Sequence, residues 1–483
     1  MLLSFVLVTS LFALWGFAND ITNPLVAAFK DVFVISNAQS SWVQMAFYGG
    51  YGTMAIPAAL FIRRFSYKAG IILGLLLYAL GAMICVPAAS MASFNLFLVA
   101  LYILTFGLAF LETTANPYIL AMGPQETATQ RLNLAQAFNP IGSLTGMTVA
   151  SLFILTNLQV EEFRTDFDGY KQDLSMTENV KKEYDVLPLF KSSQKERIED
   201  PVLADYIAAK PEATISQALE DYRNGEISTF MEKTHRELQD HDLKIIATPY
   251  MIIGFVIIGM LLLFIISKLP HLGTSQDERE NSSLSEILRR LLKNPLYVGG
   301  VIAQTFYVGA QIMCWTFIIQ YAQENLGMDK ATAQNHNIGA MVVFLLSRFI
   351  CTFFLKFISP GKLLTLLSIV GIVCTLGAIY LQGMAGLYAL MAVSACMSLM
   401  FPTIYGIALN GLGPDAKIAS AGLILAIVGG AFMPRIQAGI MDMESFLGTT
   451  GLRGSFYLPV ICFVVITAYA LLTMYMSNKP KTT

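Results

Sequence analysis

Charged residues are scarce in this sequence: Asp, Glu, Lys and Arg make up 13% of its 483 residues, and histidine occurs four times. Soluble globular chains carry about twice that charged fraction. There is no basic face to attract nucleic acid, no Ser/His/Asp grouping, and no glycine-rich phosphate loop. The six cysteines lie in apolar stretches without a metal-type spacing. The composition therefore argues against an enzyme, a cofactor, a metal site or a nucleic acid partner.

Hydrophobic residues, by contrast, make up 55% of the chain, and the mean hydropathy is +0.59. Apolar runs of about 20 residues, long enough to cross a bilayer as helices, recur along its length. We predict an all-α membrane protein with twelve transmembrane helices, at about 2–28, 41–62, 69–89, 94–121, 132–156, 244–267, 295–323, 334–355, 363–382, 385–411, 417–440 and 455–476. The first run lacks a basic leader and contains Trp15 and Asp20, so we interpret it as a retained span rather than a signal peptide.

Positive residues gather in the short loops on one side of these spans. That side holds Arg63, Arg64, Lys68, Arg131, Lys268, Arg279, Arg289, Arg290, Lys293, Lys356, Lys362, Lys417, Lys479 and Lys481. Outside one long loop, the opposite side has only Lys30, Lys330 and Arg453. The positive-inside rule therefore predicts that both termini are cytoplasmic.

Two polar segments interrupt the membrane pattern. Residues 157–243 contain twenty acidic residues against eleven Lys or Arg, and we expect them to form an external cap with two short amphipathic helices on either side of Gly225. Residues 268–294 form a charged cytoplasmic linker. The predicted domains are thus a six-helix bundle (1–156 plus 244–267), the external insertion (157–243), the linker (268–294), and a second six-helix bundle with the tail (295–483).

A weak internal repeat supports this division. Gly123-Pro124 follows the fourth span as Gly413-Pro414 follows the tenth, and Pro117 and Pro402 occupy corresponding places inside those spans. Two six-helix halves related as parallel repeats, with a site between them near the midplane, are the architecture of major facilitator transporters.

Glu112 is the carboxylate that most needs an explanation, because it lies inside the apolar run 94–121. Ionisable side chains in hydrocarbon cost roughly 2.5–3.5 kcal/mol on insertion scales and usually mark a transport path. Asn116 lies one helical turn on, and Pro117 frees the carbonyl of Thr113. We therefore predict that Glu112 couples protons to transport.

A motif of polar residues that ends in Asn-Pro occurs three times in the first half: at Asp20 to Pro24, Glu112 to Pro117 and Asn133 to Pro140. Such groups suit a hydroxyl-rich solute, and an aromatic face suits the apolar side of a sugar ring. The alternative is that these polar groups only join helices. The predicted substrate contacts are Asn23, Asn116, Gln136, Asn139, Gln311, Trp315 and Tyr405.

Asp20 is the second candidate for proton coupling. At ~1.5 Å per residue it lies roughly 27 Å from the cytoplasmic end of its span, whereas Glu112 lies about 13 Å from its own. This separation favours a staged relay over a shared proton. Of the charged residues in the second half, we expect Arg348 to extend toward the cytoplasmic surface. Arg435 lies near the outer end of its span on the face of Asp442, so we expect either an external gate or ion pair there or a contact with the substrate.

At these residues the chain resembles the fucose permease family of sugar:proton symporters within the major facilitator superfamily. The resemblance covers nearly all spans and is carried by motifs such as Trp15 to Asn19, Ala46 to Gly49, Gly107 to Pro117, Arg131 to Gln136 and Tyr307 to Gln311. It implies that Glu112 is the proton-coupling and sugar-contacting glutamate, and that Gln136 and Asn139 line the sugar cavity. One difference is that this chain has Asn23 where the family has its other essential aspartate, and Asp20 one turn earlier.

The sequence thus predicts a monomeric symporter of a bacterial inner membrane that imports L-fucose or a related hexose with H⁺ by alternating access. Two alternatives remain open. One is a symporter for glucose, galactose or N-acetylglucosamine, with H⁺ or Na⁺ as the coupling ion. The other is a sugar sensor that does not transport.

Overall fold

The structure, a computed structural model, describes residues 2–35, 39, 42–174, 197–267, 269–270, 283–328 and 330–477. Within them, twelve helices are long and apolar enough to cross a membrane, which confirms the predicted all-α membrane class. The first six spans are α1 (Leu2–Phe33), α3 (Trp42–Arg64), α4 (Tyr67–Ser90), α5 (Phe94–Ala121), α6 (Ala128–Gln136) with α7 (Asn139–Val149), and α11 (His235–Ile266). The other six are α13 (Pro295–Leu326), α14 (Lys330–Phe354), α15 (Pro360–Tyr380), α16 (Met384–Met397) with α17 (Met400–Leu409), α18 (Ala416–Leu425) with α19 (Gly429–Met441), and α21 (Tyr457–Ser477).

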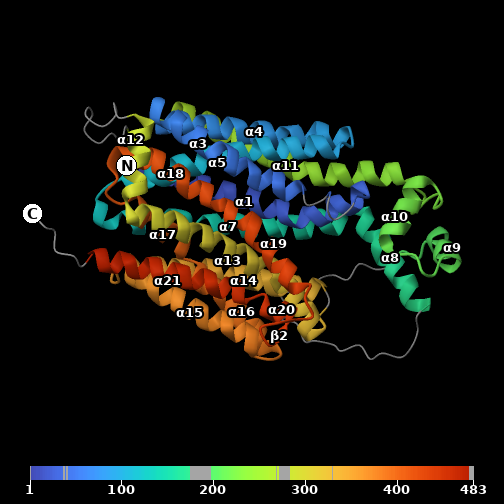
Figure 1. The fold of residues 1–483 in the computed structure, drawn as a ribbon. Coiled ribbons are helices and arrows are strands. Elements are labelled where there is room, and N and C mark those ends of the chain that lie inside the picture. Colours follow the sequence, from blue (N-terminus) through green and yellow to red (C-terminus); the bar gives the residue numbers. More distant parts are fainter. Residues whose placement is uncertain are drawn as a thin grey trace, which may run out of the picture.

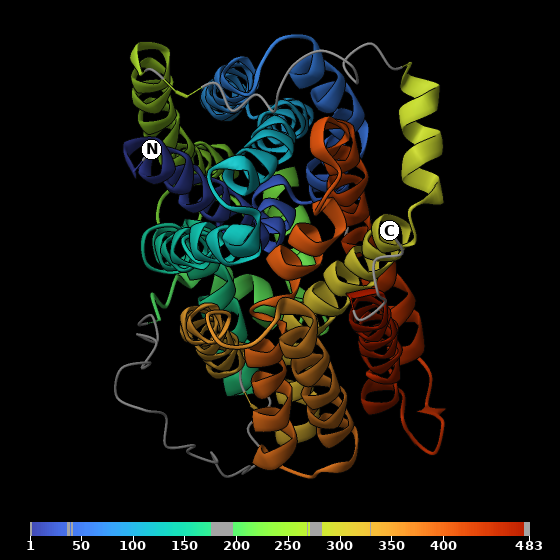
Figure 2. The same ribbon diagram turned by 90° about the vertical axis from the view of Figure 1, so that its left-hand side faces the viewer.

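The two sets of spans form two groups, which we call the first and second halves of the protein (Figure 2). The start of α1 and the end of α21 lie at one end of the bundle, which we call the terminal end (Figure 1). Helices α8 (Gln159–Leu174), α9 (Pro201–Ala209) and α10 (Ile215–Asn224) lie beyond the opposite end, the cap end (Figure 1). A small hairpin, β1 (Ser445–Phe446) with β2 (Thr449–Thr450), precedes the short helix α20 (Gly451–Gly454). The linker carries α12 (Leu284–Lys293).

Residues 159–174 and 197–234, here called the cap, are held together by buried aspartates. Asp242 accepts hydrogen bonds from the backbone nitrogens of Gln159 and Val160, which satisfies the start of α8. Asp200 does the same for α9 and also accepts from the backbone of Met231. Each carboxylate thus uses backbone donors that burial would otherwise leave unpaired.

The expected helices of the cap are confirmed only in part. Helix α10 ends at Gly225, which has a positive φ of 88°, as the sequence indicates. The second expected helix, across 227–238, is wrong: the chain is irregular until Thr234 caps α11, and α11 then continues into the sixth span. Helices α8 and α9 were not predicted.

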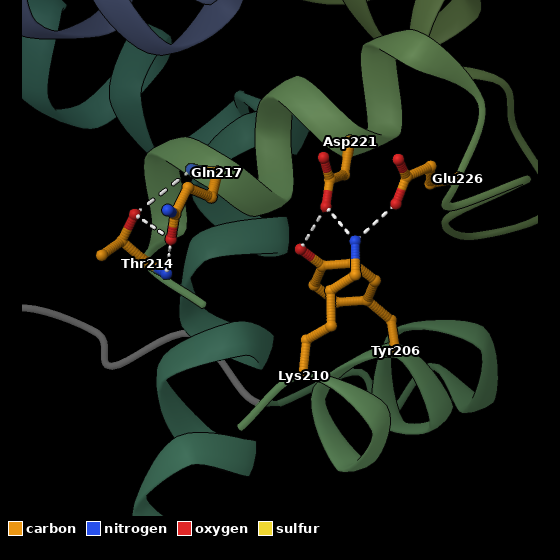
Figure 3. Close-up of polar contacts among 6 residues, drawn as sticks. All are labelled: Tyr206, Lys210, Thr214, Gln217, Asp221 and Glu226. Atoms are coloured by element: carbon orange, nitrogen blue, oxygen red, sulfur yellow. Dashed lines mark hydrogen bonds and ion pairs between the residues drawn. The ribbon is translucent and has the colours of Figure 1, made fainter. Parts of the chain in front are cut away.

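An exposed cluster joins α9 to α10 (Figure 3). Lys210 donates to both Asp221 and Glu226, and the Tyr206 hydroxyl donates to Asp221 at 2.7 Å. The hydrogen bond from Lys210 lowers the pKa of Asp221, while the two carboxylates raise the pKa of Lys210. The contribution of Asp221 to cap stability is therefore present at neutral pH and is lost as the pH falls through its lowered pKa.

Close packing of helices within each half depends on small residues. A Cβ at Gly107 of α5 would lie 2.4 Å from the Tyr78 nitrogen and 2.5 Å from the Gly74 carbonyl oxygen of α4. Likewise, a Cβ at Gly142 of α7 would lie 1.8 Å from the Ala13 carbonyl oxygen of α1. Glycine lets these backbones touch, which is how membrane helices gain dispersion contacts without a hydrophobic driving force.

Two of the hydrogen bonds that join the two halves use carbonyls that prolines leave without a helical donor. Pro117, Pro140 and Pro402 have no N–H to offer the residues four positions earlier, which are Thr113, Gln136 and Ser398. The Thr113 carbonyl accepts from the Ser420 hydroxyl at 3.3 Å, across the boundary between halves.

Arg348 of α14 satisfies the other two carbonyls. Its guanidinium donates to the Ser398 carbonyl within its own half and to the Gln136 carbonyl of the first half, at 2.9 Å in the latter case. A further bond across the boundary runs from the Asn133 amide to the Thr403 hydroxyl at 3.2 Å. These cross-half bonds all lie in the terminal half of their helices, so in this structure the two halves are joined at the terminal end.

Replacing Gly107 by Leu should destabilise the first half, because overpacking a tight contact costs about 1–3 kcal/mol. The expected result is a lower midpoint of thermal unfolding in detergent. Gly259→Leu is the matched control, since no atom of the described residues lies within 4 Å of a Cβ at Gly259 of α11. Equal midpoints for the two variants would contradict the proposed packing.

Replacing Arg348 by Gln should open the terminal end more often, since a buried carbonyl left unpaired costs about 1–3 kcal/mol. A cysteine at Thr129, whose side chain lies against Gly406 of the other half, reports this opening. We expect a membrane-impermeant maleimide, applied from the terminal side, to label Thr129→Cys faster when Arg348→Gln is also present. Unchanged labelling would show that Arg348 does not hold the halves together.

Candidate functional site

Glu112 is buried in α5, with 4% of its surface exposed. Its carboxylate accepts a hydrogen bond from the Tyr51 hydroxyl of α3 at 3.0 Å. Among the described residues, no Lys, Arg or His lies within ion-pair distance of it. A buried carboxylate without a cation is costly, and protonation removes that cost. Glu112 therefore has the environment of a group that binds and releases a proton.

An amide chain runs from Glu112 into the fifth span. The Asn116 amide donates to the Glu112 carbonyl at 3.0 Å, and its side-chain oxygen accepts from the Gln136 amide at 2.8 Å. Gln136 in turn accepts from Arg348 through its backbone carbonyl. The structure thus brings together three of the residues predicted from sequence, Glu112, Asn116 and Gln136, and connects them to the second half.

Asn139 opens α7 where the fifth span is interrupted, at Ala137 and Phe138. It is half-buried, and its amide donates to the Phe12 carbonyl of α1 at 3.2 Å. Of the three Asn-Pro pairs, this is the one at a helix break, because α1 and α5 continue through theirs.

Asp20 is half-buried on α1, and its carboxylate interacts electrostatically with Tyr48 of α3. One turn on, Asn23 belongs to α1, but its side chain lies outside the described residues. Between them, the Thr22 hydroxyl is 3.0 Å from that of Tyr250 and ties α1 to α11. Asp20 of α1 and Glu112 of α5 thus both interact with tyrosines of α3, Asp20 with Tyr48 and Glu112 with Tyr51.

In the second half, the predicted residues of α13 are half-buried. Gln311 and Trp315 lie one turn apart, and the indole N–H of Trp315 donates to the Ser394 hydroxyl at 3.1 Å. The Trp315 ring also makes an edge contact with Phe344, with ring centroids 5.0 Å apart. This fixes the orientation of the indole face. Tyr405 of α17 is fully buried and lies within electrostatic range of Glu112.

The expectation for Arg348 is wrong, and for Arg435 the structure bears on the ion pair alone, so that a gate or a substrate contact at Arg435 stays a prediction. Arg348 does not extend to the membrane surface: it is 3% exposed, and its guanidinium lies 4.5 Å from the centre of the Phe344 ring. The freed carbonyls and the ring face compensate its charge in place of an acid. Arg435 is exposed on α19, and the part of the chain that the structure describes shows no ion pair between it and Asp442.

Two contacts of the fourth span were not predicted from the sequence. Tyr51 donates to the Glu112 carboxylate, and Ser420 donates to the Thr113 backbone carbonyl. The signal for Tyr51 was its place one turn after Tyr48 on the same helix. Ser420 gave no signal, because its partner is a backbone carbonyl. Within the described residues, no group of three or more His, Cys, Asp or Glu side chains could hold a metal ion.

The major facilitator superfamily model matches residues 6–163. An L-fucose-proton symporter of Haemophilus influenzae is 48% identical over 96% of this chain and 95% of its own. The L-fucose-proton symporter of Escherichia coli is 32% identical over 97% and 92%, respectively. A glucose/galactose transporter of Brucella abortus is 28% identical over 96% and 92%.

A solved structure shows the same relationship. The crystal structure of the major facilitator transporter FucP in the outward conformation matches with a TM-score of 0.75 and 30% identity, over 97% of this chain and 98% of that one. The fold is therefore the major facilitator fold, with the buried Glu112 and the amide chain beside it. The chain belongs to the family of fucose permeases and glucose/galactose transporters within the major facilitator superfamily.

Proposed function

We propose that this protein imports L-fucose together with a proton by alternating access. The observation that carries the proposal is Glu112, a buried carboxyl that has no cation beside it among the described residues, with amides of the fourth and fifth spans linked to its helix. The names of the two fucose symporters to which the chain is similar support fucose as the sugar and H⁺ as the coupled ion.

We infer that the terminal end faces the cytoplasm of a bacterium, from the excess of Lys and Arg in its loops. The chain then divides into two six-helix bundles, an external insertion at 157–243 and a cytoplasmic linker at 268–294. With the halves joined at the cytoplasmic end, this conformation corresponds to the outward state, which agrees with the similarity to FucP in that state. The working unit in this proposal is a monomer in the inner membrane.

The sugar would bind between the halves. Asn116, Gln136 and Asn139 supply amides to hydroxyl groups from one side, and Gln311 supplies another from α13. The indole face of Trp315, held in place by Ser394, suits the apolar face of a pyranose ring, and Tyr405 closes the site toward Glu112. Asn23 completes the set, because it lies one turn from Asp20 on the same face of α1.

Proton coupling follows from the cost of a buried charge. With Glu112 protonated and sugar bound, the site is neutral, and the halves can reorient without carrying a carboxylate across hydrocarbon. Each proton that moves inward contributes about 2.3 kcal/mol per 100 mV of membrane potential to sugar accumulation. Asp20 is placed to serve the outer stage of this relay, in place of the aspartate that the family has at the position of Asn23.

A glucose or galactose substrate is the alternative that the Brucella abortus relative supports. Uptake of a panel of labelled monosaccharides into proteoliposomes, with and without an imposed pH gradient, distinguishes fucose from glucose or galactose as the substrate. Fucose transport driven by the gradient is expected. Dependence on Na⁺ in place of H⁺ would contradict the coupling ion, and saturable binding without counterflow would show a sensor.

Glu112→Gln should abolish accumulation driven by a pH gradient, because the amide cannot take up or release the proton. Counterflow exchange of sugar should remain, since the neutral amide mimics the protonated acid. Gln320→Glu on the exposed face of α13 is a control for an altered charge in a span. If Glu112→Gln still accumulates sugar in response to the gradient, Glu112 is not the coupling group.

A further inference from the structure

Glu112 is sealed in this conformation, and so is the group that contacts it. The carboxyl is 4% exposed, and Tyr51, whose hydroxyl donates to it at 3.0 Å, is 1% exposed. Gly50 allows this contact, because a Cβ at that position would lie 2.7 Å from Thr105 of α5 and would separate the two helices. The polar side chain that contacts the carboxyl directly is thus one of α3.

Tyr48 lies one turn before Tyr51 on the same helix, so the two side chains are neighbours on one face. Tyr48 is half-buried and interacts electrostatically with both Asp20 and Tyr51. The order Asp20, Tyr48, Tyr51, Glu112 thus runs from half-exposed groups to sealed ones, across α1, α3 and α5.

A third hydroxyl close to Tyr51 is already committed. Tyr78 of α4 interacts electrostatically with Tyr51, but its own hydroxyl donates to the Leu14 carbonyl at 2.9 Å. The Tyr51 ring is also held by Phe47, with ring centroids 6.1 Å apart. Its hydroxyl therefore donates to Glu112 and lies within electrostatic range of Tyr48.

We propose that the Tyr51 hydroxyl relays the proton between the Asp20 and Tyr48 side of the cavity and Glu112. This role rests on the proton coupling proposed above. An incoming proton, from cavity water or from protonated Asp20 through Tyr48, bonds to the Tyr51 oxygen as the original O–H bond breaks and that hydrogen bonds to the Glu112 carboxylate oxygen. Tyr51 is neutral before and after, Glu112 becomes the carboxylic acid, and the donor loses one proton.

The relay accounts for the placement of Asp20. A carboxyl at that position need not touch Glu112, because two phenols one turn apart bridge the gap from α1 to α5. Tyr51 also orients the carboxylate, as the donor of its hydrogen bond. The position of the acid one turn before Asn23 is therefore compatible with coupling.

Tyr51→Phe tests this role, because it removes the hydroxyl and keeps the ring. Fucose accumulation driven by a pH gradient, and the alkalinisation of the medium when fucose is added, should both fall about tenfold or more, as expected when a proton-transfer group is lost. Counterflow exchange, which needs no net proton release, should change much less. Tyr321→Phe is the matched control, since that hydroxyl donates to the Ala378 carbonyl at 2.7 Å in the other half.

Each outcome decides a different point. If the unmodified protein shows no response to the pH gradient, the proposed function fails. If it responds and Tyr51→Phe responds equally, or loses counterflow to the same extent, the relay is wrong. Should Tyr51→Phe not yield folded protein, Tyr48→Phe decides by the same comparison: gradient-driven uptake slower than in Tyr321→Phe, with counterflow kept, supports the relay.

Discussion

Every backbone carbonyl inside a bilayer needs a donor, and this structure depends on how that requirement is met where proline removes one. Thr113, Gln136 and Ser398 each lose the helical donor four residues on, and Ser420 and Arg348 replace it. Two of these three bonds cross between the halves. The prolines thus give the first half two acceptors that Ser420 and Arg348 of the second half satisfy at the terminal end.

The two buried ionisable groups near this contact are stabilised in opposite ways. Arg348 keeps its charge, because carbonyl dipoles and the Phe344 ring surround the guanidinium. Among the described residues Glu112 has one phenol and no cation beside it, so its charge is tolerated only while water reaches the site, and a bound proton removes the charge when the site is closed. A permanent cation suits a structural contact, and a carboxyl that can become neutral suits a cycle of binding and release.

Much of the fold could be predicted because each signal was local. Apolar runs of the right length gave the twelve spans, and Gly225 marked the end of a helix in the cap. The freed Thr113 carbonyl was also predictable from Pro117. The second cap helix was not, because the stretch from Ile227 to Thr234 has helical spacing but is held as irregular chain by bonds from distant residues, such as that from Met231 to Asp200. Arg348 was misplaced for the same reason: its acceptors lie 50 and 212 residues away.

The sequence by itself determined that this is a helical membrane protein and which of its spans contain prolines. It also determined that Glu112 requires a function, since hydropathy and the cost of a charge in hydrocarbon depend on local composition alone. Only the tertiary structure decided which groups meet. Tyr51 reaches Glu112 because α3 and α5 approach at Gly50, and Arg348 reaches Gln136 because α14 faces the fifth span. Hydrogen bonds between distant helices depend on how the helices pack in three dimensions, and a local sequence pattern does not indicate that packing.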